Sequence, residues 1–368
     1  MENLAHTLFG ITLAKAGLER ATPLATTALV ISSNIPDIDV LMRLRGGALS
    51  YIDYHRGITH SFLGIALLAA ALTFILAYID RRFRLRSDPF RRPIRPVRLF
   101  LISVLGGLGH LFMDYTNVYG LRPLLPFKAK WFYGDLSFIV DPWIWLILGS
   151  SVVWLTARNG PRIVAWFIIG IALSFIMATA LRQPTPDFPY TIPDMARIIW
   201  FGGLALILLG ALFRWGRGGE KVARYSLLLM VVYYGGLWVA RGDAIERARA
   251  ALPARETSPV FAWPVPANPV SWTAVTTADG FIYTRNVNLF GQQGDWTSQP
   301  MLEYRFVEAL RQSDRARIFL DFARYAVADT REHENGYDIT LTDIRFNLRL
   351  DARLDRELVV QSAEVHWF

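Results

Sequence analysis

Long apolar segments alternate with short polar connections over the first 240 residues of the chain. Apolar runs cover residues 61–79, 97–118, 138–157, 163–181, 198–213 and 225–240. Each run approaches the roughly 20 residues that a helix needs to cross the hydrocarbon core of a bilayer. The pattern therefore predicts an all-α polytopic membrane domain with about six spans over residues 1–240.

The first 34 residues differ from this pattern because their two apolar segments, 4–14 and 21–33, are shorter than a span. A re-entrant or tightly packed helical hairpin is expected there, with short spans as the alternative. Pro36 stops a helix, so Asn34-Ile-Pro-Asp-Ile-Asp39 is expected as an extended loop at the mouth of the hairpin. Alternate residues of an extended chain point to opposite sides, so one of Asp37 and Asp39 is expected to be a direct ligand of any bound ion.

The character of the chain changes after residue 240. Five prolines between residues 253 and 269 predict a stiff, extended connector, and we assign residues 241–269 to a linker. Residues 271–277 and 281–289 are typical of two strands around Ala-Asp-Gly280, a hairpin signal. Residues 298–311 are mixed, with room for a helix, and 319–329, 337–350 and 357–368 are expected as further strands. Residues 270–368 are therefore predicted to form a small β-rich (α+β) soluble domain.

Composition and charge agree with a membrane protein. The chain is 53% hydrophobic and has 12 Trp, and the absence of Cys excludes thiolate catalysis, Cys-ligated zinc and disulfides. The net charge is +8, yet residues 241–368 carry 15 Arg against 18 acidic residues, so the positive excess lies in the connections of the first 240 residues. The arginine-rich connection 80–98 is cytoplasmic by the positive-inside rule, which places residues 241–368 on the outer side. Aromatic-interleaved basic clusters are missing, so no nucleic-acid partner is expected.

His110 and Asp114 are the first candidates for chemistry. Four residues apart in an apolar helix, they share one face, and ionisable groups within a bilayer are costly and mark functional sites. The alternatives are a polar pair that joins helices or a step in a proton path. Strict alternation of the spans brings further groups to the same outer end, which makes a metal site the preferred interpretation. The candidate metal ligands are His6, Asp37, Asp39, His55, His60, His110 and Asp114.

Imidazole and carboxylate ligands without sulfur suit Zn, with Mn or Fe as alternatives. More candidate ligands are present than the three of a mononuclear hydrolytic zinc site, so a dinuclear site bridged by an Asp is plausible, and one or two divalent ions are expected. Arg56 or Arg122 is predicted to hold the phosphate oxygens of a substrate. His333 and His366 have no partner pattern, and we expect both to be structural.

The motifs taken together resemble a known family. His6, Asn34-x-Pro-Asp-x-Asp39, His55-Arg-Gly-x-Thr-His-Ser61 and Gly109-His-x-x-x-Asp-x-x-Asn117 are similar to the YdjM-like family of bacterial inner-membrane proteins. The family is generally described as metal-dependent hydrolases, some of them linked to the LexA-controlled damage response. More distantly, the order of residues is similar to zinc-dependent phospholipase C and P1-type nucleases, which implies His6, Asp37, His60, His110 and Asp114 as ligands. The additional ligands and the amino-terminal Trp of those enzymes have no counterpart here.

Two main functions are consistent with the sequence. The first is a membrane-bound metal-dependent hydrolase that acts on a phosphoester or other lipid-linked substrate at the outer face of the bacterial inner membrane. The second is a non-catalytic envelope scaffold or regulator, with a structural metal and a protein partner for the carboxy-terminal domain that the sequence does not identify. A transporter is a third and weaker hypothesis. Transport sites lie near the membrane midplane, whereas the ionisable residues here gather at one end of the spans.

Overall fold

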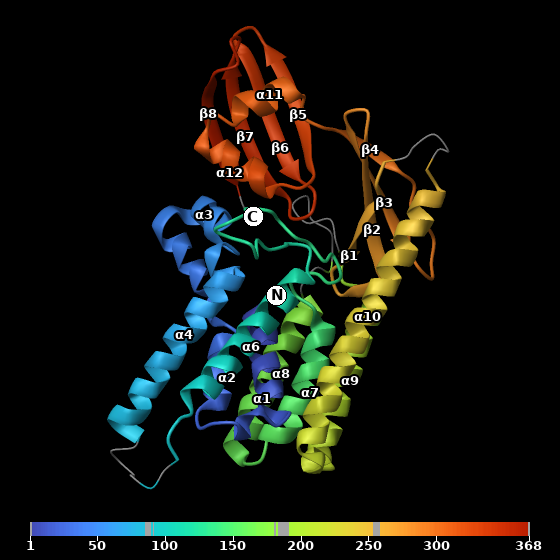
Figure 1. Ribbon diagram of the computed structural model, residues 1–368. Coiled ribbons are helices and arrows are strands. Elements are labelled where there is room, and N and C mark those ends of the chain that lie inside the picture. The colour runs from blue at the N-terminus through green and yellow to red at the C-terminus, as the bar shows by residue number, and fades with distance from the viewer. Residues whose placement is uncertain are drawn as a thin grey trace.

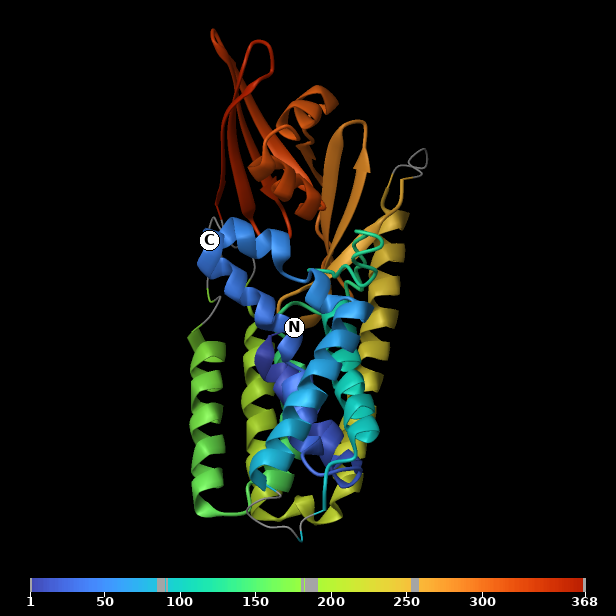
Figure 2. The same ribbon diagram turned by 60° about the vertical axis from the view of Figure 1, so that its left-hand side comes forward.

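The computed structural model describes residues 2–84, 90, 92–179, 182, 191–252 and 258–366. The described residues up to Ala250 are mainly helical, and those from Phe261 onward form two small antiparallel sheets with two short helices at one end of the helical bundle (Figures 1 and 2). Arg86 and Arg91 of the predicted basic connection lie outside the described residues, as do half of the connection 182–197 and Pro253 of the predicted linker.

The helical half begins with a hairpin and continues with long apolar helices. Five helices among the described residues are long and apolar enough to cross a membrane, and α7 is a shorter apolar helix beside them. This confirms the predicted helical membrane domain. In chain order the elements are α1 Asn3–Lys15, η1 Leu18–Arg20, α2 Ala25–Ser32, η2 Ile35–Met42, α3 Arg43–Tyr54, η3 Ile58–His60, α4 Phe62–Ile79, η4 Asp80–Arg84, α6 Pro96–Tyr115, α7 Pro142–Thr156, α8 Gly160–Thr179, α9 Asp194–Leu212, η5 Trp215–Gly218 and α10 Glu220–Ala250.

The helices of the bundle run up and down in alternation (Figures 1 and 2). The carboxy-terminal ends of α4, α7 and α9 lie away from the sheets, and the mouth of the α1–α2 hairpin lies at the sheet end. The described arginines of η4, of the connection between α7 and α8 and of η5 therefore share one end of the bundle, while η2, η3 and the end of α6 share the other.

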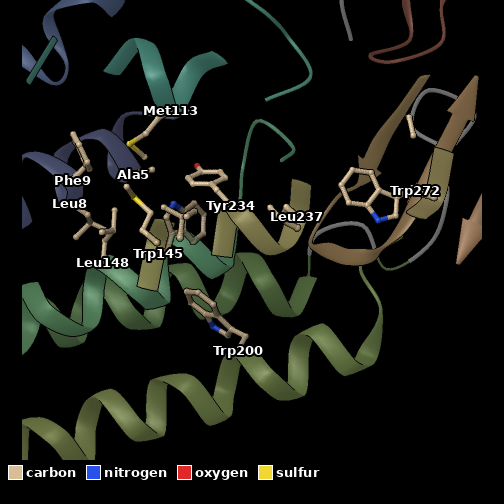
Figure 3. Packing of buried hydrophobic residues seen from close by; sticks show 14 of the residues in the cluster. Ala5, Leu8, Phe9, Met113, Trp145, Leu148, Trp200, Tyr234, Leu237 and Trp272 are labelled. Carbon is tan, nitrogen blue, oxygen red and sulfur yellow. The ribbon is translucent and has the colours of Figure 1, made fainter. Parts of the chain in front are cut away.

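Close contact between α1, α2 and α6 positions the candidate site. A Cβ on Gly106 of α6 would lie 2.1 Å from Ser32 Oγ, and a Cβ on Gly10 of α1 would lie 2.9 Å from the carbonyl oxygen of Leu29. Small residues allow membrane helices to approach closely. Around this contact the side chains of Leu8, Phe9, Met113 and Trp145 form a buried apolar cluster (Figure 3).

The carboxy-terminal half contains two four-stranded sheets, in the orders β1-β2-β3-β4 and β5-β6-β7-β8, in which every strand pair is antiparallel. The predicted hairpin at Ala-Asp-Gly280 joins β2 to β3, and both Asp279 and Gly280 have positive φ, as this type of turn demands. The elements are β1 Phe261–Val265, β2 Asn268–Ala278, β3 Phe281–Asn288, β4 Thr297–Pro300, α11 Tyr304–Leu310, α12 Asp314–Phe322, β5 Ala326–His333, β6 Gly336–Asp343, β7 Leu348–Asp355 and β8 Val360–His366.

Several predicted elements differ from the structure. The prediction of one strand over 319–329 is wrong: Ala316, Phe319 and Phe322 are buried at helical spacing in α12, and β5 begins at Ala326. The expected strand 337–350 is divided into β6 and β7 by a turn in which Asn347 has a φ of 55°. Helix α10 extends to Ala250, ten residues into the predicted linker, and β1 occupies part of the rest.

The sheet half packs directly on the loop that follows α6. The ring of Tyr119 lies 4.9 Å from the ring of Phe322 and 5.7 Å from that of Phe346, between centroids. Arg345 donates a hydrogen bond to the carbonyl oxygen of Val118. Trp131 of the same loop also packs against Phe322. The second half therefore covers the end of the helical bundle at which the candidate site lies.

Candidate metal centre

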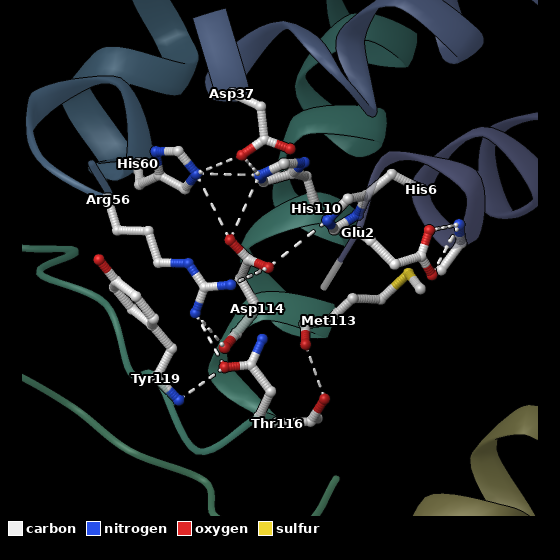
Figure 4. Close-up of polar contacts among 12 residues, drawn as sticks. Glu2, His6, Asp37, Arg56, His60, His110, Met113, Asp114, Thr116 and Tyr119 are labelled. Carbon is white, nitrogen blue, oxygen red and sulfur yellow. Dashed lines mark hydrogen bonds and ion pairs between the residues drawn. The ribbon is translucent and has the colours of Figure 1, made fainter. Parts of the chain in front are cut away.

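Four short segments deliver the predicted ligands to one place. His6 comes from the first turns of α1, Asp37 and Asp39 from η2, His55 and His60 from the segment between α3 and α4, and His110 and Asp114 from the last turns of α6. Figure 4 labels His6, Asp37, His60, His110 and Asp114. The segment 34–39 is a 3₁₀ helix and not the extended loop that we expected. Its curvature turns both Asp37 and Asp39 toward the histidines, and all seven side chains are buried.

Four of these residues form a compact inner group: Asp37, His60, His110 and Asp114. His60 Nε2 lies 3.1 Å from His110 Nε2, 3.3 Å from Asp37 Oδ1 and 3.4 Å from Asp114 Oδ2. His110 Nε2 lies 3.4 Å from Asp114 Oδ2 and 3.7 Å from Asp37 Oδ1. Ligands at 2.0–2.1 Å from a tetrahedral zinc ion are separated by about 3.3–3.4 Å. The spacing of the four atoms therefore fits one cation between them.

In His60 and His110 the other ring nitrogen, Nδ1, contacts an oxygen outside the inner group, so that Nε2 faces the group. His110 Nδ1 is 2.8 Å from the carbonyl oxygen of Ser33, which accepts only if Nδ1 carries the proton. His60 Nδ1 is 3.1 Å from Asp39 Oδ2, a carboxylate acceptor. With Nδ1 protonated, each neutral ring offers an Nε2 lone pair, the arrangement in which histidines bind metals.

Asp39 belongs to a second group with Asp37 and His55, and Asp37 is shared by both groups. The Asp39 carboxylate already has many partners. Oδ1 lies 2.8 Å from His55 Nδ1, while Oδ2 accepts from the Thr59 hydroxyl at 2.8 Å and from the backbone N–H of Arg56 at 3.1 Å, besides its contact with His60. These contacts are those of a carboxylate that orients neighbouring side chains.

The two terminal nitrogens of Arg56 bind the site and the loop 117–120, whereas its Nε has no hydrogen bond among the described residues. Its guanidinium donates to Asp114 Oδ1, Asn117 Oδ1 and the carbonyl oxygen of Gly120, each at 2.9 Å, and it is 2% exposed. It also lies 4.6 Å from the centre of the Tyr119 ring. The guanidinium therefore ties α6 to the loop 117–120 and holds Asp114 Oδ1, while Oδ2 faces His60 and His110 (Figure 4).

The electrostatic balance of the group favours a cation. Burial by itself would raise the pKa of Asp39, but hydrogen bonds from His55 and His60 hold that pKa below its ordinary value, and His60 does the same for Asp37. Burial would lower the pKa of His60, yet Asp114, Asp37 and Asp39 together raise it to about 10. A proton on His60 and a divalent cation offset the same carboxylates, so binding of the cation would release the proton.

Buried polar atoms without hydrogen bonds give a separate test of fit. Asp37 Oδ2 and both ring nitrogens of His6 make no hydrogen bond among the described residues. The ring of His6 stacks on that of His110 at 3.9 Å, and His6 Nε2 is 3.4 Å from Asp114 Oδ1. Buried polar groups of this kind are normally satisfied, and a bound ion with its water would satisfy them.

The remaining predicted residues lie elsewhere. Arg122 stacks on Trp131 at 4.7 Å and donates to the carbonyl oxygen of Asp53, at the edge of the cluster. His333 and His366 lie on β5 and β8, where their nearest ion-pair partners are Asp338 and Asp351.

Several residues that support the ligands were not predicted from the sequence. Thr59 donates to Asp39, and the backbone carbonyl of Ser33 orients His110. Tyr51 stacks on His55 at 4.5 Å, and the ring of Tyr119 meets the same imidazole edge to face. Thr59 lies in the chain between His55 and His60, and this position could have indicated a supporting role. A backbone carbonyl gives no signal in the sequence.

Comparison with known proteins adds the following. A family model described as "YdjM inner membrane protein" matches residues 1–184, which include every candidate ligand. A relative from Bacillus subtilis (strain 168), described as "Uncharacterized protein YfhP", is 27% identical over 194 residues. That match covers 50% of this chain and 55% of the relative, so the chain spans about half the length of the curated relative. No solved structure matches the chain. Similarity to phospholipase C or P1-type nucleases is not shown.

Proposed function

The chain belongs to the YdjM inner membrane protein family, and we propose that it is a membrane-bound metal-dependent hydrolase. The observation that carries the proposal is the inner group of two imidazoles and two carboxylates, whose facing atoms lie 3.1–3.7 Å apart in the pairs given above. The coarser features, a membrane protein with a buried cluster able to hold a metal ion, are established by the fold and the family.

One divalent ion, zinc in preference to manganese or iron, is assigned to Asp37, His60, His110 and Asp114. Such an ion supplies Lewis acidity toward a substrate oxygen and lowers the pKa of a coordinated water. Asp39 and Ser33 hold the two histidines in the tautomer that presents Nε2. His6 contacts Asp114 and is placed to contact the ion's water. A second ion at Asp37, Asp39 and His55 is the alternative, which the hydrogen bonds of Asp39 disfavour.

For the substrate we propose a phosphoester, lipid-linked in preference to soluble. Arg56 is a positioning residue, because its two terminal nitrogens are engaged by Asp114, Asn117 and Gly120. Arg122 is the better candidate for holding phosphate oxygens, because it is partly exposed, whereas Arg56 is 2% exposed. Asp37, Asp39 and His55 keep 7–8% exposure, whereas His60, His110 and Asp114 have none, so a substrate would approach from the side of η2.

The proposed location is the inner membrane of a bacterium, with the site and residues 241–368 on the outer side. The support is the gathering of arginine-rich connections at the opposite end of the bundle (Figures 1 and 2). Reporter fusions near residues 90 and 300 should give opposite signals. Equal signals would contradict this orientation.

Turnover tests the hydrolase proposal. The purified zinc-loaded protein should hydrolyse bis(4-nitrophenyl) phosphate in detergent, and a fluorescent phospholipid in phosphatidylglycerol vesicles faster. His110→Ala should abolish both activities while expression and melting temperature persist, and Arg122→Gln should reduce turnover with metal content unchanged. Equal rates on both substrates would remove the lipid preference, and no hydrolysis of either would contradict the proposal.

A structural metal is the second candidate function, and the burial of the group favours it. None of the four inner ligands is more than 8% exposed, and structural sites are closed whereas catalytic ones keep an open position. The chain would then be an envelope scaffold or regulator whose sheet half binds a protein partner. Removal of the metal would in that case lower the melting temperature while the metal-loaded protein hydrolyses neither phosphoester.

A further inference from the structure

A second polar site lies in the sheet half, away from the histidines. A cavity of about 680 Å³ is bounded by strands β1–β4 on one side and by β5, β6 and the turn before β7 on the other. Thr191 and Pro193, just before α9, also line it. Small-molecule sites have volumes of about 300–1,000 Å³, so the cavity is large enough for an organic ligand of two or three rings.

The register of the first sheet determines which side chains face this cavity. Ser271 is paired with Asn288, and Thr273 with Asn286, so the four side chains lie on one face of the β2–β3 ladder. Thr284 and Gln299 share that face, since Thr284 is two residues from Asn286 and Gln299 is paired with Ile282. All six line the cavity, and all six are neutral hydrogen-bonding residues. The neighbouring Trp272 and Ala274 belong to the apolar cluster shared with α10, and Trp272 (Figure 3) also borders the cavity.

None of the described residues that line the cavity offers an unpaired charged side chain to a ligand. Arg345 is the one ionisable residue in the lining, and it is 1% exposed. Its guanidinium donates to both oxygens of Asp343 and to the carbonyl oxygens of Phe322 and Val118. A phosphate or carboxylate ligand would need a free Arg or Lys, so the lining selects for a neutral ligand.

Thr273 points to a ligand with hydroxyl groups. Its Oγ1 is buried and has no hydrogen-bond partner among the described residues, although the side chain faces the cavity. A buried hydroxyl is normally paired, and a ligand hydroxyl would pair it. The amides of Asn286 and Gln299, which are exposed on the same wall, each offer donors and an acceptor, as a hydroxyl does. Ile344 and Phe346 add apolar surface on the opposite wall.

We propose that this cavity binds a neutral carbohydrate, as a segment of two or three sugar units. Sugar hydroxyls donate and accept at once, which matches amide and hydroxyl side chains, and the C–H faces of the rings match Ile344 and Phe346. The binding does not depend on the metal centre and does not rest on the proposed hydrolase activity.

Binding by the full-length, detergent-solubilised protein tests this proposal. In saturation-transfer NMR and calorimetry, at least one of N-acetylchitotetraose, maltotetraose and cellotetraose should bind, with tetra-alanine and inorganic phosphate as counter-probes. Thr273→Val and Asn286→Ala should each weaken that binding about three- to tenfold, the loss expected for one hydrogen bond. Thr330→Val, a matched change of an exposed threonine on β5, should have no effect.

Each outcome of these measurements either supports or overturns the carbohydrate proposal. Saccharide binding that is weakened in Thr273→Val and Asn286→Ala, retained in Thr330→Val and unaffected by chelation of the metal supports it. Thr273→Val preserves shape, so its melting temperature in the absence of ligand should match that of the parent protein, which separates lost binding from lost folding. Failure of all three saccharides to bind, binding unchanged by both variants, or binding of tetra-alanine or phosphate in their place would overturn it.

Discussion

The helical half and the sheet half each gather polar side chains, but the two sets differ in charge and burial. At the end of the helices the polar groups are ionisable, and His60, His110 and Asp114 are fully buried. In the cavity of the sheets they are amides and hydroxyls, and Asn286 and Gln299 remain exposed. Buried charges require compensation whereas neutral polar groups tolerate water, so the first set demands a cation and the second does not. Variants that compare the two halves can test this contrast.

The largest effect is expected from Asp114→Ala. This carboxylate faces three histidines and accepts from Arg56, so its removal deletes a ligand and leaves a buried guanidinium without its charge partner. Loss of one member of a buried ion pair costs about 3–5 kcal/mol of unfolding free energy. Metal analysis and thermal unfolding in detergent should show both losses. Asp338→Ala, a change of an exposed carboxylate on β6, should lower neither the metal content nor the stability. Full metal occupancy in Asp114→Ala would show that Asp114 is a helix-pairing carboxylate and not a ligand.

His110→Ala should have the next largest effect. It removes a ligand nitrogen, and because loss of supporting residues alone costs about 10- to 100-fold in metal affinity, loss of a ligand should cost more than about 100-fold. Competition with a chromophoric chelator measures this affinity. His366→Ala and His333→Ala in the sheets should leave the affinity unchanged. Equal effects in the two halves would remove the distinction between them.

Asp39→Asn should have a smaller effect on the metal. If Asp39 orients His60 and His55 without binding the ion, affinity should fall about 10- to 100-fold while the number of ions per chain stays the same. His55→Ala should likewise retain one ion. A fall from two ions to one in either variant would instead establish a second metal at Asp37, Asp39 and His55.

Arg56→Lys should have the smallest effect on metal content. Lysine keeps the charge but cannot contact Asp114, Asn117 and Gly120 at once, so metal should stay bound while the unfolding free energy falls by about 1.5–3 kcal/mol, the contribution of a charged hydrogen bond. Arg353→Lys on β7, which is 73% exposed, should leave unfolding unchanged. Loss of metal in Arg56→Lys would show that the guanidinium is needed to hold the ligand set together.

Much of the helical half could be predicted from the sequence, because runs of apolar residues identify spans without reference to their neighbours. The elements of the sheet half were harder to predict from the sequence. The segment 319–329 has enough apolar residues for a strand, and its division into two elements depends on the packing of α12 against β7 and β8 and on the pairing of β5 with β6. The length of α10 was missed because five of its last ten residues are charged, and this part of the helix packs against β1, β2 and β3.

Residues with unusual chemistry could be identified from the sequence, as ionisable groups in apolar surroundings and basic connections between alternate pairs of spans in a chain without cysteine. How these groups contact one another depends on the tertiary fold. Whether Asp37 or Asp39 faces the inner group depends on the curvature of η2, and the tautomer of His110 depends on a backbone carbonyl of α2's end. The cavity of the sheets arises from strand register and from the contact between two halves of the chain. Local patterns carry no record of such long-range pairings, because each depends on residues far apart in sequence.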